Sequence, residues 1–443
     1  MEPTDELKKD LLSLVWGENI SEAIIKRWSQ GFEWSPDERC ALTQRHGGPC
    51  AVIVPVQAYF VKNLIFNAPE NNEDLPEVNN CDWRNLQDEQ RKEVFLRTLR
   101  EMLERSSSSQ ENKTITLVTF DKDRTTPDEP EHCDSANHEE IEQFSKHSRL
   151  RLHTCSSTED LISSLSSKYG KLTQKYGVLS FLYSVILTRG IENIRNEMDS
   201  QDVCLIDSIH GHGSQNLINL MICGEAVSNV WDGIKYISGL QLRGIPCQCD
   251  IGFLTLLEKF RYCSVGESLK RPKYPVWIIG SETHLTLLFT LETALVAQES
   301  PYEVAMKVFQ EYDPEDNGFI AAVLLPDVMT RLDLVAEPEY VKIIQEKLDP
   351  EELGVILQSK FLNEFFADDD KKSVPDSFLV LHYNGLTQSS QDSKVLFHEG
   401  AAVIIDWQES GNRSSDSVIE SCLQMRWPGI QISWKNEIIP SLN

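Results

Sequence analysis

The feature that most constrains this chain is a long apolar run, residues 50–66, in which Lys62 is the only charged side chain. A helix that is hydrophobic all round has to be buried on all sides. The run therefore predicts a helix at the centre of a large core, enclosed by other elements. A turn that contains Gly47, Gly48 and Pro49 comes directly before the run and marks the start of the helix at Cys50.

Length and charge exclude several classes of protein. The chain has 443 residues, enough for about two or three domains. Hydrophobic residues make up 40% and charged residues 25%, which is typical of globular proteins and excludes a wholly disordered chain. Lys and Arg number 42 and Asp and Glu number 69, so the net charge is −27. Such a charge repels phosphate backbones and anionic membranes, so we expect neither nucleic acid nor membrane as a partner, whereas a basic protein would be attracted.

Cysteine usage and the N-terminal segment predict the cellular compartment. The 11 cysteines are an odd number without framework spacing. Residues 1–11 carry many charges, which no secretory signal peptide tolerates. The longest uncharged apolar stretch, residues 177–188, is too short to span a bilayer. We therefore expect an intracellular protein, in the nucleus or the cytoplasm, with reduced thiols. The sequence does not indicate an oligomeric state.

Hydrophobic periodicity predicts an α+β fold. Helical patterns occupy the front half, at residues 5–32, 83–105, 158–167 and 178–198. Strand patterns dominate the C-terminal third, at residues 276–279, 285–291, 378–382, 395–397 and 402–407, after an earlier strand at 114–120. Residues 67–80 are expected to form a loop, and residues 124–139 are expected to be mobile because little there could offset the entropy of ordering.

A charged helical segment, residues 301–370, interrupts the strands and predicts an insertion. It contains two similar octets that start at Asp313 and Asp349, each with Gly at the sixth position and Ile at the eighth. This is the core pattern of an EF-hand loop. We therefore expect an EF-hand-like subdomain between two parts of one core, residues 1–300 and 371–443.

The two octets lack the residue that closes a calcium site. An EF-hand loop needs a bidentate Glu at its twelfth position. That position is Leu324 in the first loop and Lys360 in the second. We therefore expect no metal and no other cofactor. A calcium sensor is the least favoured of the functions weighed.

The segment from Gln44 to Cys50 carries the pattern of a nucleophile. At a helix start, unpaired amides and the helix dipole are expected to lower the pKa of the Cys50 thiol and favour the thiolate. Gln44 could aim its amide at the point that the Cys50 N–H also faces, and two such donors form an oxyanion hole. The alternative is that Cys50 is an inert buried thiol.

A cysteine nucleophile needs a base, and His284 is the best candidate. It follows a tight turn and precedes a predicted strand, which would hold an imidazole at a sheet edge. Asn384 ends the next predicted strand and could orient that imidazole through its side-chain oxygen. The alternatives are a hydrogen-bonded core histidine and an Asn-Gly dipeptide that only forms a turn.

Three motifs together resemble the MINDY family of deubiquitinases: Gly-Gly-Pro-Cys50-Ala-Val with Gln44, Ala226-Val-Ser-Asn-Val-Trp-Asp-Gly233, and Gly280-Ser-Glu-Thr-His284. The resemblance covers nearly the whole chain and is closest to the member with an EF-hand-like insertion. It implies a papain-like cysteine protease core that cleaves isopeptide bonds after the C-terminal glycine of ubiquitin. It also implies a preference for long polyubiquitin chains of the lysine-forty-eight type.

Carried over residue by residue, the resemblance places the nucleophile at Cys50, the general base at His284 and the oxyanion glutamine at Gln44. Asn384 is placed by position alone. The second function weighed is a catalytically silent ubiquitin-binding scaffold on the same fold.

Two weaker signals stay open. His210, His212, Cys247 and Cys249 offer a donor set that zinc would accept, although their spacing is unusual. The loop that carries the two histidines could instead line a channel for the ubiquitin tail. Trp231 could contact substrate or cap the core.

Overall fold

The computed structural model describes residues 1–17, 20–66, 83–107, 114–121, 149–297, 300–313, 317–367, 375–389, 392–405 and 417–443. The chain forms two compact units. Unit 1 comprises Met1–Glu292 together with Asp376–Asn443, and unit 2 comprises Thr293–Pro375. The expected loop at residues 67–80 and the expected mobile segment at 124–139 lie outside the described residues.

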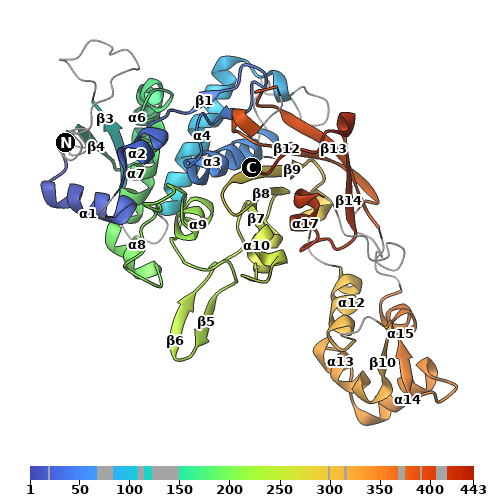
Figure 1. Ribbon diagram of the computed structural model, residues 1–443. Helices are drawn as coiled ribbons and strands as arrows, with labels where there is room; N and C mark the ends of the chain where they lie inside the picture. The colour runs from blue at the N-terminus through green and yellow to red at the C-terminus, as the bar shows by residue number, and fades with distance from the viewer. Residues whose placement is uncertain are drawn as a thin grey trace. The chain divides into compact units, whose positions relative to one another are not determined.

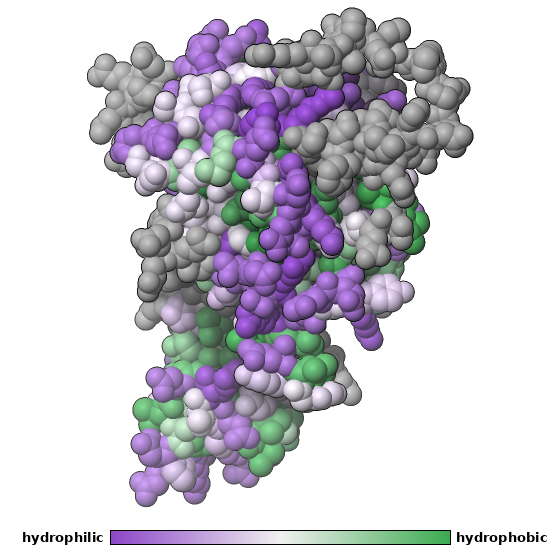
Figure 2. All heavy atoms as spheres, turned by 90° about the vertical axis from the view of Figure 1, so that its left-hand side faces the viewer, coloured by the Kyte–Doolittle hydropathy of each residue, from purple (hydrophilic) through white to green (hydrophobic). Residues whose placement is uncertain are grey.

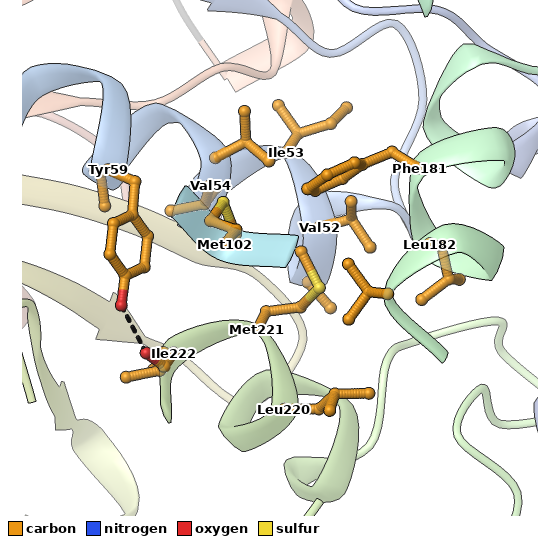
Figure 3. Packing of buried hydrophobic residues seen from close by; sticks show 14 of the residues in the cluster. Val52, Ile53, Val54, Tyr59, Met102, Phe181, Leu182, Leu220, Met221 and Ile222 are labelled. Carbon is orange, nitrogen blue, oxygen red and sulfur yellow. Dashed lines mark hydrogen bonds between the residues drawn. The ribbon is translucent and has the colours of Figure 1, made fainter. Parts of the chain in front are cut away.

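Helix α3 (Cys50–Ile65) is the centre of unit 1, and every one of its residues is buried. It packs on helices α4 (Asp88–Ser106), α7 (Gly177–Arg189) and α9 (Gln215–Cys223) and on two strands of the main sheet. Figure 3 shows the apolar side chains of these helices meeting around α3. The hydroxyl of Tyr59 donates to the carbonyl of Ile222 at 2.6 Å, so the one polar atom of that side chain is satisfied. The enclosed helix that the apolar run predicts is therefore present.

The main sheet of unit 1 has six strands in the order β14-β13-β12-β9-β8-β7. All neighbours are antiparallel except β7 and β8, which are parallel. The strands are β7 (Gly252–Thr255), β8 (Val276–Gly280), β9 (Leu285–Thr290), β12 (Ser377–Tyr383), β13 (Phe397–Ile404) and β14 (Ile430–Trp434). In Figure 1, α3 lies between the helical side of unit 1 and this sheet. Sheet and helices together form the α+β fold that the sequence predicts.

The remaining elements of unit 1 flank this core. The helices are α1 (Asp5–Trp16), α2 (Glu22–Trp28), α6 (Thr158–Leu172), α8 (Ile191–Glu197), α10 (Leu256–Lys259), α11 (Glu267–Lys270) and α17 (Val418–Leu423). Three two-stranded sheets pair β1 (Glu33–Trp34) with β2 (Leu42–Thr43), β3 (Ile115–Phe120) with β4 (Leu150–Cys155), and β5 (Ile234–Ile237) with β6 (Leu240–Arg243). Hydrophilic side chains form a broad band on the face shown in Figure 2. No helix within the described ranges is long and apolar enough to cross a membrane.

Unit 2 has its own core, formed by helices α12 (Pro301–Glu311), α13 (Leu325–Arg331), α14 (Pro338–Leu348) and α15 (Gln358–Phe365). Its strands β10 (Phe319–Ala321) and β11 (Val355–Leu357) pair antiparallel, with Ile320 opposite Ile356. The carboxylate of Asp313 accepts from the amides of Asn317 and Gly318, and Asp349 accepts from the equivalent two amides of its own loop. Both acidic side chains are therefore engaged by their own loops.

Several of the predicted elements are wrong in extent. The helical segment predicted over residues 5–32 is two helices, α1 and α2, and Gly17, with a φ of 70°, ends the first. The helix predicted over residues 178–198 is two helices, α7 and α8, because Gly190 between them has a φ of 91°. The strands predicted at 395–397 and 402–407 are one strand, β13, within the described residues. This strand continues because Gly400 has no side chain, and a Cβ there would lie 2.6 Å from the side chain of Ile432. Small residues thus let β14 pack across the point where a break was expected.

A buried glutamine in α3 holds the segment that leads to the site. Gln57 is fully buried, accepts from the amide of Leu42 at 2.7 Å and donates to the carbonyl of Cys40 at 2.8 Å. Gln57→Leu keeps the bulk of the side chain but leaves both backbone groups unpaired. Each unpaired buried group costs about 1–3 kcal/mol, so we expect the free energy of unfolding to fall by about 2–4 kcal/mol in urea titrations.

The matched control is Gln201→Leu, because Gln201 is exposed. That substitution should change the free energy of unfolding by no more than about 0.5 kcal/mol. Equal stability of the Gln57→Leu variant and the original chain would show that Gln57 does not anchor this segment.

Candidate active site

Cys50 is the first residue of α3 and is almost fully buried, at 4% exposure. The carbonyl of Pro49 accepts from the amides of Val52 and Ile53, both at 2.9 Å, which starts the helix directly at the cysteine. The Sγ atom lies 3.6 Å from the carbonyl oxygen of Gly48. The glycine turn and the helix start thus place the thiol where the sequence predicts it.

The expected lowering of the Cys50 pKa is wrong for this state of the protein. Burial raises the pKa of the Cys50 thiol, although hydrogen bonds with the backbone of Leu285, Ala51 and Gly48 act in the opposite direction. Desolvation penalises the charged thiolate, and this effect exceeds the stabilisation from amides at the helix start. In the free protein Cys50 is therefore a thiol near neutral pH.

His284 sits at the end of a tight turn that joins β8 to β9. The turn is closed by the amide of Ser281, which donates to the carbonyl of His284 at 2.9 Å, and by the hydroxyl of Ser281, which accepts from the His284 amide at 3.0 Å. Burial lowers the pKa of His284, as does the nearby charge of His212 when protonated, while a hydrogen bond with Asn384 opposes the change. The imidazole is therefore neutral near pH 7.

Asn384 fixes which nitrogen of His284 carries the proton. Its Oδ1 lies 2.9 Å from Nε2 of His284 and also accepts from the amide of Leu386 at 3.0 Å. Its Nδ2 donates to the carbonyl of Ser441 at 3.1 Å, which sets the orientation of the side-chain amide. Because Oδ1 can only accept, Nε2 carries the hydrogen and the lone pair is left on Nδ1. An imidazole in this tautomer can take a proton at Nδ1.

Cys50 interacts with the residue next to His284 in the chain and with the residue next to Asn384. The backbone of Leu285, directly after His284, forms a hydrogen bond with the Cys50 sulfur. On the adjacent strand, Tyr383 comes directly before Asn384. Burial raises the pKa of the Tyr383 hydroxyl, and the charge of a Cys50 thiolate would raise it further. The start of α3 and the ends of β9 and β12 thus bring Cys50, His284 and Asn384 to one place.

Gln44 is fully buried beside the same strand end. Its backbone amide donates to the carbonyl of Gly385 at 2.7 Å, and Gln44 forms a parallel bridge with Leu386. Its side-chain Nε2 donates to the carbonyl of His46 at 2.8 Å, and its Oε1 is buried without a hydrogen-bond partner among the described residues. A primary amide has two N–H groups, so one donor remains beyond the bond to His46.

The loop of residues 209–213 packs directly on the nucleophile turn. A Cβ added at Gly213 would lie 2.3 Å from the Cβ of Ala51, and one added at Gly48 would lie 3.1 Å from the carbonyl oxygen of Gly211. The indole of Trp28 donates to that same carbonyl at 2.9 Å. The small size of these glycines therefore lets the loop pack against Gly48 and Ala51, which lie before and after Cys50 in the sequence.

The donor set considered for zinc is not assembled. Among the described residues, no group of three or more His, Cys, Asp or Glu side chains could hold a metal ion. His210 pairs with Asp207 at 3.2 Å, and the Cys249 Sγ donates to the carbonyl of Cys247 at 3.6 Å. Trp231 lies at the base of the β5–β6 hairpin, where the Lys235 ammonium stands 4.7 Å from its ring centre.

Two supporting residues were missed from the sequence. The hydroxyl of Tyr383 donates to the carbonyl of Leu42 at 2.6 Å, and Gln57 holds the amide of the same residue. Together they fix the strand that ends at Gln44. A glutamine inside an otherwise apolar run is a signal that could have found Gln57, because a buried amide needs partners. Nothing in the sequence pattern singles out Tyr383.

Comparison with known proteins shows the family. Residues 13–311 match the model described as "Deubiquitinating enzyme MINDY-3/4, conserved domain". The chain therefore belongs to the MINDY deubiquitinases, which are thiol-dependent hydrolases, and the resemblance seen in the sequence is confirmed.

Several curated relatives match over nearly the full length. The Bos taurus protein named "Ubiquitin carboxyl-terminal hydrolase MINDY-3" is 46% identical over 99% of this chain and 100% of its own length. The Homo sapiens protein of that name is 45% identical with the same coverage. A Drosophila melanogaster MINDY-3 homolog is 38% identical over 98% of this chain and 83% of its own length. No solved structure matches the chain.

The raised pKa of Cys50 predicts how its alkylation depends on pH. Only the thiolate reacts, and its fraction grows about tenfold per pH unit below the pKa. Because burial shifts the pKa upward, the rate of iodoacetamide labelling at Cys50 in the free protein should still be rising above about pH 8.

The rate is measured by mass spectrometry of the Cys50 peptide, with Cys50→Ala as the blank. A plateau below about pH 6 would indicate a thiolate–imidazolium pair in the free protein and contradict the raised pKa.

Proposed function

We propose that this chain hydrolyses isopeptide bonds in polyubiquitin through a Cys50–His284 mechanism. The observation that carries the proposal is the hydrogen bond between Nε2 of His284 and Oδ1 of Asn384, which leaves the lone pair on Nδ1, while Leu285, the next residue, lies at the Cys50 sulfur. A hydrogen-bonded core histidine would have no need of a free nitrogen on that side. The family match supports the ubiquitin substrate.

The proposed chemistry follows the usual course of a thiol hydrolase. Nδ1 of His284 takes the proton from Cys50, and the thiolate attacks the carbonyl of the ubiquitin C-terminal glycine. The tetrahedral oxyanion accepts hydrogen bonds from the Cys50 amide and from the remaining N–H of Gln44. His284 then gives its proton to the departing lysine amine, and a thioester forms. Water, deprotonated by His284, attacks the thioester and regenerates the thiol.

The raised pKa of Cys50 assigns a role to the substrate in this scheme. Before substrate binds, the raised pKa of Cys50 and the lowered pKa of His284 both favour the neutral forms, so the proton stays on the thiol. Transfer to His284 becomes favourable as attack proceeds, because negative charge moves to an oxygen that two donors face. Activation would thus depend on a bound carbonyl.

Three finer features belong to the proposal. We infer a papain-like arrangement of the core, in which the nucleophile opens a buried helix and the base and its orienting residue come from the sheet. Unit 2 is inferred to be an EF-hand-like pair that binds no calcium, since Leu324 and Lys360 stand where closing ligands would be needed. Long chains of the lysine-forty-eight type are the proposed substrates.

A catalytically silent ubiquitin-binding scaffold is the second candidate, and the burial of Cys50 is the observation that favours it. The free thiol is neither exposed nor activated. A ubiquitin probe with a C-terminal electrophile separates the two functions, because only a competent nucleophile forms the covalent adduct.

Cys50→Ala should abolish cleavage of polyubiquitin, since no other group can form the thioester. Cleavage of a tetraubiquitin substrate is followed on gels. The thermal midpoint should change little, because one buried sulfur is removed where a small side chain fits. Cys247→Ala is the matched control, since Cys247 is exposed and should be dispensable. Cleavage by the Cys50→Ala variant would eliminate the cysteine mechanism.

Gln44→Ala should lower kcat by about 10²–10³, the usual cost of one oxyanion donor. The rate is measured with a fluorogenic ubiquitin amide, and stability is measured in parallel because Gln44 is buried. Gln44→Glu keeps the size of the side chain but removes both N–H donors, and it should be slow as well. A normal rate in a folded variant would place Gln44 outside the oxyanion hole.

A further inference from the structure

His212 is a second histidine beside the catalytic pair. It lies between Gly211 and Gly213, and both neighbours pack on the nucleophile turn, one at Gly48 and the other at Ala51. The two contacts bracket Cys50 in the chain. On its other side, a positive charge on His212 would lower the pKa of His284. The loop that carries His212 therefore packs on the nucleophile turn, and His212 lies close enough to His284 to affect its pKa.

The loop around His212 is fixed by polar contacts that leave its ring nitrogen free. The amide of Asp207 donates to the carbonyl of His212 at 2.8 Å, and Arg27 donates to the carbonyl of His210 at 2.6 Å. Nδ1 of His212 is nevertheless buried without a hydrogen-bond partner among the described residues. A buried polar atom without a partner costs about 1–3 kcal/mol, so its persistence at this position calls for a functional reason.

The protonation of His212 indicates what kind of partner this nitrogen can take. Burial lowers the pKa of His212, and the charges of His210 and Arg27 lower it further, so the ring is neutral near pH 7. A buried N–H without a partner is rarer than an acceptor without one. We therefore place the lone pair of the neutral ring on Nδ1, the buried atom without a partner among the described residues, and the hydrogen on Nε2.

We propose that His212 contacts the substrate directly, and that its Nδ1 accepts a hydrogen bond from a backbone N–H of the glycine-rich tail leading to the scissile carbonyl. The inference rests on the proposed function, which supplies that tail. Glycine-rich backbone has exposed N–H groups and no side chains, so it can pass close to a loop that itself has glycines on both sides of the contact. The bond would hold the carbonyl at Cys50 without taking part in proton transfer.

His210 provides a matched control two residues away. The two imidazoles are nearly parallel, with ring centres 6.0 Å apart. The side chain of His210 is 70% exposed and pairs with Asp207. The same substitution can therefore be made on the half-buried ring of His212 and on the exposed ring of His210 in one loop.

The experiment compares the original full-length chain with His212→Phe, His212→Asn and His210→Phe, using a ubiquitin probe with a C-terminal electrophile. Phe keeps the ring but has no nitrogen, and Asn keeps an acceptor. Labelling of Cys50 should slow about tenfold in His212→Phe, the worth of one hydrogen bond. It should stay within about threefold in His212→Asn and be unchanged in His210→Phe. Iodoacetamide should label Cys50 at the same rate in all four proteins.

A second probe tests the hydrogen bond itself. Replacing each of the last two tail amides of the ubiquitin probe in turn by an ester removes one N–H. One of the two esters should slow labelling of the original chain by about tenfold and should not slow His212→Phe any further. If His212→Phe does not fold, His212→Asn takes its place in this comparison, and labelling of the original chain that neither ester slows still overturns the inference.

The possible failures are distinct. If the original chain is labelled and neither ester nor His212→Phe slows it, the inference is overturned and the proposed function stands. If His212→Phe slows labelling of Cys50 by iodoacetamide as much as labelling by the ubiquitin probe, His212 affects the reactivity of the thiol and not the binding of the tail. That result also overturns the inference. If iodoacetamide labels Cys50 but the ubiquitin probe does not, the proposed function fails and the inference falls with it.

Discussion

The burial of α3 on every side is the constraint on which the rest of unit 1 depends. A helix with no solvent-facing residue needs partners all around it, and here helices α4, α7 and α9 and the sheet supply them. The same enclosure decides the chemistry at its first residue. Because Cys50 is part of the core, its thiol is shielded from solvent, and this desolvation favours the neutral thiol over the thiolate.

Buried polar side chains in this apolar core form hydrogen bonds that connect the segments around the site. The side chain of Gln57 accepts a hydrogen bond from the amide of Leu42, and the hydroxyl of Tyr383 donates one to the carbonyl of Leu42. The strand that follows leads to Gln44, which in turn bonds to the carbonyl of Gly385 next to Asn384. The nucleophile helix and the two strand ends are thus joined by hydrogen bonds in low dielectric, where such bonds are strong and their loss is costly.

The parts of this structure that local patterns determine were predictable. The apolar run predicted α3, and the strand-like runs before and after the insertion predicted β8, β9 and β12. The hydrogen bond of His284 to Asn384 agrees with their predicted places at neighbouring strand ends, although their catalytic roles remain predictions. Other features depend on distant residues. The parallel strand β7 is only four residues long, and its pairing with β8 leaves no local pattern.

The pKa of Cys50 and the position of the 209–213 loop were not predictable for a similar reason. The helix start is visible in the sequence, but the extent of desolvation depends on what packs against it from elsewhere in the chain. The loop was considered as a channel lining or a zinc ligand, and only the contacts of Gly211 and Gly213 with the nucleophile turn show which segment it faces. Contacts between residues far apart in the sequence therefore determine both the pKa of Cys50 and the position of the loop.

The place of unit 2 in the chain affects the order in which the site can form. Strand β9, all six residues of which are buried, pairs with β12, yet all of unit 2 is made between them. At roughly 5–20 residues per second, synthesis of unit 2 takes on the order of several seconds. During that time β9 is an open, apolar sheet edge, the kind of surface that recruits other chains. Asn384 follows β12 directly in the chain, so the strand that covers the edge of β9 also brings the residue that sets the tautomer of His284.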